Sequence, residues 1–96
     1  MHFNVSKHAV DRYLQRVEGA SFSESRFHVN RVRARLQIRE DLRGVEIPVR
    51  TEQTAVHLPR YIAIVRNGSV VTILKPGMDD YLPSVTVHHQ PAEAAV

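Results

Sequence analysis

The chain has 96 residues, of which 43% are hydrophobic and 24% charged, and its formal net charge is +3. This length provides one domain without a second core, and the composition is that of an ordinary globular protein. The absence of cysteine excludes disulfides and thiolate metal sites, and no apolar run reaches the roughly 18 residues of a membrane span. The N-terminal sequence lacks the basic-then-apolar order of a signal peptide, so we expect a cytoplasmic protein without a membrane partner.

The basic residues are almost all of one kind. All 13 are arginines except Lys7 and Lys75. A guanidinium offers a planar fork to phosphate and stacks on flat rings, so this bias favours a nucleic-acid partner. A genome rich in G and C produces the same bias through its codons, and the composition alone leaves both explanations open.

The first predicted elements are a short strand over residues 2–5 and a helix over residues 7–17. Ser6 stands where a helix cap is expected. Apolar residues recur at helical spacing and form one stripe, which consists of Val10, Tyr13, Leu14 and Val17. His8 and Arg12 fall on the opposite, polar side of this helix.

A second helix is expected over residues 22–39, where Ser21 and Glu24 form a capping box. Its apolar residues lie on two sides, with Phe22, Val29, Val32 and Leu36 on the main side and Phe27, Ala34 and Ile38 roughly opposite. A helix with two apolar sides is usually sandwiched between other elements. We therefore expect it between the first helix and the sheet, or between the sheet and a partner chain, which includes a homodimer through this helix.

The strongest local signal is a hairpin in which Tyr61–Val65 and Val70–Leu74 flank Asn67-Gly68. Asn-Gly supplies the positive φ angles of a two-residue type I′ turn. Because both arms are nearly continuously apolar, we expect a hairpin in the middle of a sheet or covered on both faces.

Further strands are expected over residues 54–58 and 84–88. Residues 45–49 predict an edge strand or an extended loop, because they contain Pro48. The order of elements predicts an α+β domain over residues 1–88, with a short N-terminal strand and two helices packed on one face of a small antiparallel sheet. Residues 89–96 are expected to form a flexible tail.

His8 and Arg12 carry the chemistry that the sequence offers most directly. They lie one helical turn apart, where a histidine can pass a proton and an arginine can hold a phosphate and stabilise its charge. Such a pair suits an RNA phosphodiester, where a 2′-hydroxyl loses a proton while charge builds on the phosphate. An ordinary solvated helix face has the same kind of residues, and the spacing leaves both interpretations open.

The segment SKHAVDRYLQR at residues 6–16 resembles the Ser-x-His-Ala-x-x-Arg-x-x-x-Arg opening of a group of small bacterial and phage domains of unknown function. Those domains are similar to RelE/ParE-type toxins and to the wider ribonuclease-toxin fold. The hairpin YIAIVRNGSVVTIL also resembles the central strands of this group, so the likeness covers residues 3–76. It implies a RelE/ParE-like fold and a metal-independent endoribonuclease, or an RNA-binding relative that has lost the activity.

The resemblance also implies roles for individual residues. His8 is the expected general base and Arg12 the phosphate clamp, and Thr72 joins them at the catalytic centre. The residues expected to contact the nucleic acid are Arg16, His57, Arg60 and Tyr61. RelE-type nucleases use a basic set with a late tyrosine, whereas this chain has Tyr81 as its only late tyrosine and almost no lysine. This departure speaks against ribosome-dependent cleavage of mRNA.

Two other classes of function fit the sequence. A phage or mobile-element protein that inhibits a host nucleic-acid-handling complex would use a surface patch of aromatic residues and arginines, for example Phe27, Arg31, Ile38 and Tyr81. A DNA-binding regulator ranks lowest, because the arginines surround the second helix. The expected partner is thus RNA, or a host or antitoxin protein. The six histidines show no HxxxH or HExxH spacing, so we expect no metal site and no cofactor.

Overall fold

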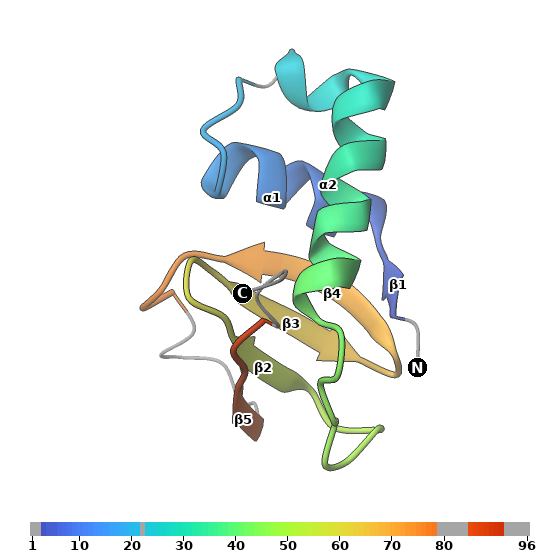
Figure 1. Ribbon diagram of the computed structural model, residues 1–96, viewed down its shortest axis with the longest axis vertical. Coiled ribbons are helices and arrows are strands. Elements are labelled where there is room, and N and C mark those ends of the chain that lie inside the picture. The colour runs from blue at the N-terminus through green and yellow to red at the C-terminus, as the bar shows by residue number, and fades with distance from the viewer. Residues whose placement is uncertain (1–2, 22, 79–84, 92–96) are drawn as a thin grey trace, which may run out of the picture.

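The computed structural model of the chain describes residues 3–21, 23–78 and 85–91 (Figure 1). Its helical elements, in chain order, are α1 (Lys7–Arg16), the 3-10 turn η1 (Glu24–Arg26) and α2 (His28–Asp41). Its strands are β1 (Asn4–Val5), β2 (Thr54–His57), β3 (Ile62–Arg66), β4 (Ser69–Leu74) and β5 (Val85–His88). The predicted α+β class is confirmed.

The sheet is mixed, in the order β1-β4-β3-β2-β5. β2, β3 and β4 form an antiparallel meander, while β1 runs parallel to β4 and β5 runs parallel to β2. The prediction of an antiparallel sheet is therefore right for the three central strands and wrong at both edges. Both helices and two strands separate β1 from β4 along the chain, and β3 and β4 separate β2 from β5. Because no tight turn joins either edge strand to its neighbour, parallel pairing is possible there.

The hairpin predicted around Asn67-Gly68 is confirmed as β3 and β4. Asn67 has a φ of 50° and Gly68 a φ of 77°, the two positive values that a type I′ turn requires. β3 lies in the middle of the sheet, and its residues alternate between two buried clusters. Ala63 belongs to the cluster shared with α1 and α2, whereas Ile64 belongs to a smaller cluster in which no described helical residue takes part. The hairpin is thus buried on both faces.

α1 begins at Ser6, as the sequence predicts. The Ser6 hydroxyl accepts a hydrogen bond from the N–H of Ala9 at 3.0 Å and donates one to the carbonyl of Val71 at 3.3 Å. The buried side chains of α1 are Ala9, Val10, Tyr13 and Leu14, and the helix packs against β4. One hydroxyl therefore both caps the helix and attaches it to the sheet.

Replacing Ser6 with alanine is expected to lower the free energy of unfolding by about 1–2 kcal/mol, because a helix N–H and a strand carbonyl both lose a partner. Urea unfolding followed by circular dichroism measures the change. Ser23→Ala is the matched control, since the Ser23 side chain makes no capping bond at η1, and it should stay within about 0.5 kcal/mol. Equal losses in the two variants would contradict the role of Ser6.

The predicted second helix is divided into two pieces. The capping box is confirmed, because Ser21 Oγ accepts from the N–H of Glu24 at 3.2 Å and Glu24 Oε1 accepts from the N–H of Ser21 at 3.4 Å. It starts only the short turn η1, however. Phe27 then takes an extended conformation with φ −66° and ψ 127°, and α2 begins at His28. The single helix predicted over residues 22–39 is wrong at this point.

The two apolar sides predicted for this helix differ in burial. Ala34 and Ile38 are fully buried against the core. Val29, Val32 and Leu36, three members of the side predicted as the main one, are exposed, and the fourth member, Phe22, lies outside the described residues. The helix packs against α1, η1 and β1 through its smaller apolar side, and its larger apolar side faces outward.

The remaining segments complete the domain. Residues 45–49 form no strand, so the extended-loop alternative is the correct one. His89, which the sequence places in the tail, donates its backbone N–H to the carbonyl of His57 at 3.0 Å, while residues 92–96 lie outside the described residues. No helix in the described part of the chain has the length and apolar character needed to cross a membrane.

Candidate functional site

His8 and Arg12 share the outer side of α1. His8 is exposed, and Arg12 is half-buried, with its Nη1 donating to Gln15 Oε1 at 2.8 Å. Gln15 in turn donates from Nε2 to the hydroxyl of Ser25 at 3.4 Å. The structure therefore keeps the two predicted catalytic residues on one helix face, and it connects that face to η1.

Thr72 lies on a different side of the molecule. It pairs with Ile64 across β3 and β4, and residues directly opposite one another share a sheet face. Ile64 belongs to the cluster on the face without described helical residues. The structure does not bring Thr72 to His8 and Arg12, which sit on the helix that covers the other face.

Arg16 contacts the backbone at the edge of the sheet. Its Nη1 donates to the carbonyl of Ile73 in β4 at 2.8 Å. Partial burial, and then the nearby charge of Arg12, lower the pKa of Arg16 from its ordinary value. This guanidinium thus satisfies a carbonyl on the outer edge of β4, beyond the end of the short strand β1.

Arg60 and Tyr61 belong to a buried pair of tyrosines. The rings of Tyr13 and Tyr61 meet edge to face, with centroids 5.3 Å apart and an interplanar angle of 87°. Arg60 Nη2 donates to the Tyr13 hydroxyl at 3.3 Å, and the Tyr61 hydroxyl donates to Asp41 Oδ2 at 2.7 Å. Tyr61 is only 2% exposed, so its hydroxyl acts within the core and offers no surface for stacking a base.

Burial raises the pKa of both tyrosines. For Tyr61 the hydrogen bond to Asp41 and the charge of that carboxylate raise the pKa further. For Tyr13 the positive charge of Arg60 opposes the effect of burial, although the pKa remains above its ordinary value. Both hydroxyls therefore keep their protons at neutral pH and act as hydrogen-bond donors or acceptors.

Two adjoining pockets flank the turn between β2 and β3, at Leu58 and Pro59. One, of about 310 Å³, is lined by Asp41, Leu58, Pro59, Arg60, Tyr61, Gln90 and Pro91. The other, of about 480 Å³, is lined by His57, Leu58, Pro59, Ile62, Pro76, His88, His89 and Gln90. The rings of His57 and His88 lie side by side there, with centroids 4.9 Å apart. Arg60 bonds to Tyr13 on the buried side of α1, so it belongs to a different region from the exposed His8.

A third hollow lies beside the outer side of α1, where the helix meets η1 and the start of α2. This hollow, of about 470 Å³, is the basic groove, and its lining residues are Lys7, Asp11, Ser25, Arg26 and Arg31. Three cationic side chains face a single carboxylate. The groove is therefore suited to an anionic ligand.

Arg31 is held firmly within the basic groove. Its Nε donates to Asp11 Oδ1 at 3.2 Å and to the carbonyl of Ser25 at 3.0 Å. Among the described residues, its two terminal amino groups have no partner. Ser25 itself is buried at 1% exposure, which fixes the carbonyl that orients the guanidinium.

Sequence reasoning missed the basic groove. Arg26 belongs to η1 and Arg31 to α2, and the break at Phe27 between these elements brings the two arginines to the same hollow. Ser25 was the one signal in the sequence, because helical spacing places this polar residue between Phe22 and Val29 on the expected main apolar side. Ser25 is buried and its hydroxyl accepts a hydrogen bond from Gln15, so packing accounts for a small polar residue at this position.

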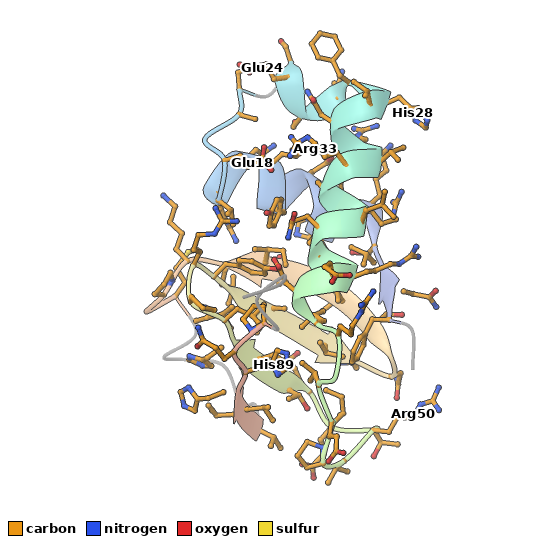
Figure 2. The ribbon with its side chains drawn as sticks, in the orientation of Figure 1. Glu18, Glu24, His28, Arg33, Arg50 and His89 are labelled. Carbon is orange, nitrogen blue, oxygen red and sulfur yellow. The ribbon has the colours of Figure 1, made fainter. Side chains whose placement is uncertain are left out.

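A salt bridge closes the far end of α1 against α2. Arg33 donates through both terminal amino groups to the two oxygens of Glu18, at 2.7 and 2.8 Å, and Figure 2 shows the two side chains meeting between the helices. Hydrogen bonds from Arg33 hold the pKa of Glu18 below its ordinary value. The Glu18 carboxylate thereby neutralises the positive charge of Arg33.

In the described part of the chain, no group of three or more histidine and carboxylate side chains converges. His89 carries a buried Nε2 without a hydrogen-bond partner among the described residues. Its Cε1 atom lies 4.0 Å from the position of a Cβ added to Gly44, so the ring packs against the loop after α2.

Comparisons with models of known protein families, with curated proteins and with solved structures give no match to this chain.

Proposed function

We propose that the protein binds RNA through the basic groove, and that it is a metal-independent endoribonuclease of the RelE-related kind or an RNA-binding relative that has lost the activity. The observation that supports this proposal is the groove itself, in which three cations surround one carboxylate next to the helix face of His8 and Arg12. Phosphate is the anion that a chain so rich in arginine is suited to hold.

Arg31 is the residue of the groove best prepared for phosphate. Its Nε bonds hold the guanidinium in one orientation, and its terminal amino groups are left for a ligand. A planar fork fixed in this way can donate two parallel hydrogen bonds to a phosphate, with little conformational entropy left to lose. Lys7, on the first turn of α1, adds an exposed positive charge at the rim.

A cleavage step can be written with the residues of α1 alone. Neutral His8 takes the proton of a 2′-hydroxyl, whose oxygen attacks the adjacent phosphorus as the bond to the 5′-oxygen breaks. The leaving oxygen takes a proton from water, and the hydroxide that remains takes the proton held by His8. The products are a 2′,3′-cyclic phosphate and a 5′-hydroxyl. Arg12 stabilises the charge that develops on the phosphate oxygens. Thr72, on the other sheet face, takes no part in this step.

RNA binding is tested by the fluorescence anisotropy of a labelled single strand of roughly 12 nucleotides. We expect Arg26→Ala with Arg31→Ala to weaken binding about tenfold or more, and to make the salt dependence shallower by about 0.7 for each phosphate that the variant no longer neutralises. The control is Arg43→Ala with Arg50→Ala, which removes the same charge elsewhere. Figure 2 shows Arg50 at the opposite end of the molecule from Glu24 of η1. If the two double variants bind RNA equally, or if the wild type does not bind it, the proposal is wrong.

Cleavage is tested with the same RNA in the presence of a metal chelator. The wild type should cut it, while His8→Ala and Arg12→Ala should leave it intact and Thr72→Ala should cut as the wild type does. Intact RNA in every reaction, together with binding by the groove, identifies the RNA-binding relative.

The second candidate is an inhibitor of a host nucleic-acid-handling complex. The patch predicted for it does not form as expected, since Ile38 is buried, Arg31 lines the basic groove and Tyr81 lies outside the described residues. Phe27 is exposed, however, at the start of a helix whose larger apolar side faces outward. That exposed side favours a role in which the protein contacts another macromolecule.

A further inference from the structure

The outward side of α2 carries three large apolar residues in one line. Val29 is 72% exposed, Val32 39% and Leu36 60%, and we call these three residues the outer stripe. Their i, i+3, i+7 spacing places them on one helix face. Phe27, 59% exposed, stands directly before the helix. The opposite face, with Ala34 and Ile38, is fully buried.

Single exposed apolar residues are common, but a continuous line at helical spacing is not. It is the pattern of a helix that is covered on both sides. Figure 1 shows the first half of α2 standing beyond the sheet, next to α1 and η1. Among the described residues nothing covers the outer stripe, so it is open to a partner.

Charged residues border the outer stripe. At about 100° per residue, Arg35 and Arg39 lie along one border, and Arg33 and Glu40 lie along the other. Arg33 is paired with Glu18 and Glu40 with Arg43. The second border is therefore neutralised within the chain.

The border formed by Arg35 and Arg39 keeps its positive charge. Arg35 Nε donates to the carbonyl of Val5 at 3.4 Å, and Arg39 Nε donates to the carbonyl of Phe3 at 3.2 Å. Neither arginine has a carboxylate partner among the described residues. Each bond uses only Nε, so both guanidinium groups are held beside the stripe, and within the described part of the chain their terminal amino groups have no partner.

A second copy of the chain fits this border poorly. In a two-fold antiparallel pair of α2 helices, each border of the stripe faces the same border of the other copy, so Arg35 and Arg39 would meet their own counterparts. Like charges brought together at an interface oppose binding. In a parallel pair they would face Arg33 and Glu40, whose charges are already satisfied. The border is complementary to carboxylates instead.

We propose that the outer stripe binds an amphipathic helix of another protein, in which apolar residues at helical spacing are flanked by Asp or Glu on the side facing Arg35 and Arg39. The apolar line supplies the contact and the two arginines select an acidic partner. The basic groove adjoins the arginine border, because Arg31 in the groove precedes Arg35 by one helical turn, but the outer stripe faces away from α1. The inference does not rest on RNA binding, since the changes at Val29 and Leu36 test the stripe without altering the groove.

The probe is a synthetic helical peptide with Leu at i, i+3, i+4 and i+7 and Glu at the flanking positions, compared with a peptide in which every Glu is Lys. By fluorescence anisotropy at low salt, the Glu peptide should bind about tenfold or more tightly than the Lys peptide. Val29→Asn with Leu36→Asn should weaken binding of the Glu peptide about tenfold or more. Arg35→Gln with Arg39→Gln should reduce the difference between the peptides, and Arg50→Gln with Lys75→Gln, which removes the same charge away from α2, should preserve it.

Several results would overturn the proposal. Equal binding of the two peptides would remove the charge selection, and binding that survives the Val29 and Leu36 changes would place the peptide elsewhere. No binding of either peptide would leave the stripe without the proposed occupant. A dimer found by sedimentation that the Val29 and Leu36 changes dissociate would make the occupant a second copy. Circular dichroism of each variant verifies that it is folded.

Discussion

Tyr13→Ala is expected to lower the free energy of unfolding by about 3–5 kcal/mol, the range found when a fully buried aromatic side chain is removed. Tyr13 is 1% exposed, packs edge to face on Tyr61 and accepts a hydrogen bond from Arg60. Its loss opens a cavity between α1 and the sheet and leaves the Arg60 guanidinium without this partner. Urea unfolding at neutral pH, followed by circular dichroism, measures the effect.

Two variants make this prediction specific. Tyr13→Phe keeps the ring and removes only the hydroxyl, so it should cost about 1 kcal/mol. Leu36→Ala removes an apolar side chain from the exposed side of α2 and should stay within about 0.5 kcal/mol. A loss for Leu36→Ala as large as that for Tyr13→Ala would mean that the outward side of α2 is part of the folded core.

The free energy of unfolding is expected to fall steeply above pH 10. Burial, followed by the bond to Asp41, raises the pKa of Tyr61 in the folded protein, and burial also raises that of Tyr13. Below pH 10 both states keep the phenolic protons, so the stabilisation is fully present. Above pH 10 the unfolded chain loses these protons while the folded chain retains them, and each tyrosine lowers the free energy of unfolding by up to about 1.4 kcal/mol per pH unit.

Tyr61→Phe separates this effect from general alkaline denaturation. At pH 7 the variant should be less stable by about 1–3 kcal/mol, because the Asp41 carboxylate loses a donor at 2.7 Å. Between pH 9 and pH 11 its stability should decline less steeply than that of the wild type, because one buried phenol no longer titrates. Urea unfolding curves across this range provide the comparison. Parallel declines in the two proteins would show that Tyr61 does not hold its proton through burial.

The elements that the sequence predicts well are those formed by neighbours in the chain. The cap at Ser6 and the turn at Asn67-Gly68 depend on a few consecutive residues, and both are present. The parallel pairings of β1 with β4 and of β5 with β2 join residues far apart in sequence. No local pattern encodes them, so the antiparallel sheet expected from the sequence is wrong at its edges.

Periodicity identified the two apolar sides of α2 without indicating which side is buried. The side with the larger residues faces outward, because the core accepts Ala34 and Ile38 at close approach. The break at Phe27 is equally invisible to a helical pattern. As a result the basic groove, which depends on the direction of η1, could not be predicted from spacing.

The position of Thr72 shows how one residue changes a site prediction. A simple alternation from Val70, which is buried on the helix side, would place Thr72 on the same face. The ladder between β3 and β4 shifts instead, because Ile64 pairs with Thr72 while the next residue, Val65, pairs with Val70. This β-bulge adds one residue to β4 and turns Thr72 to the opposite face. His8 and Arg12 stay together because they share a helix.

The pairing of β5 with β2 has a consequence for how the protein can aggregate. β5 occupies the backbone groups along one edge of β2. When β5 detaches, those groups become open to a strand of a neighbouring molecule. Conditions that release residues 85–88 while the rest of the domain stays folded therefore favour association through β2, whereas conditions that hold β5 in place keep that edge covered.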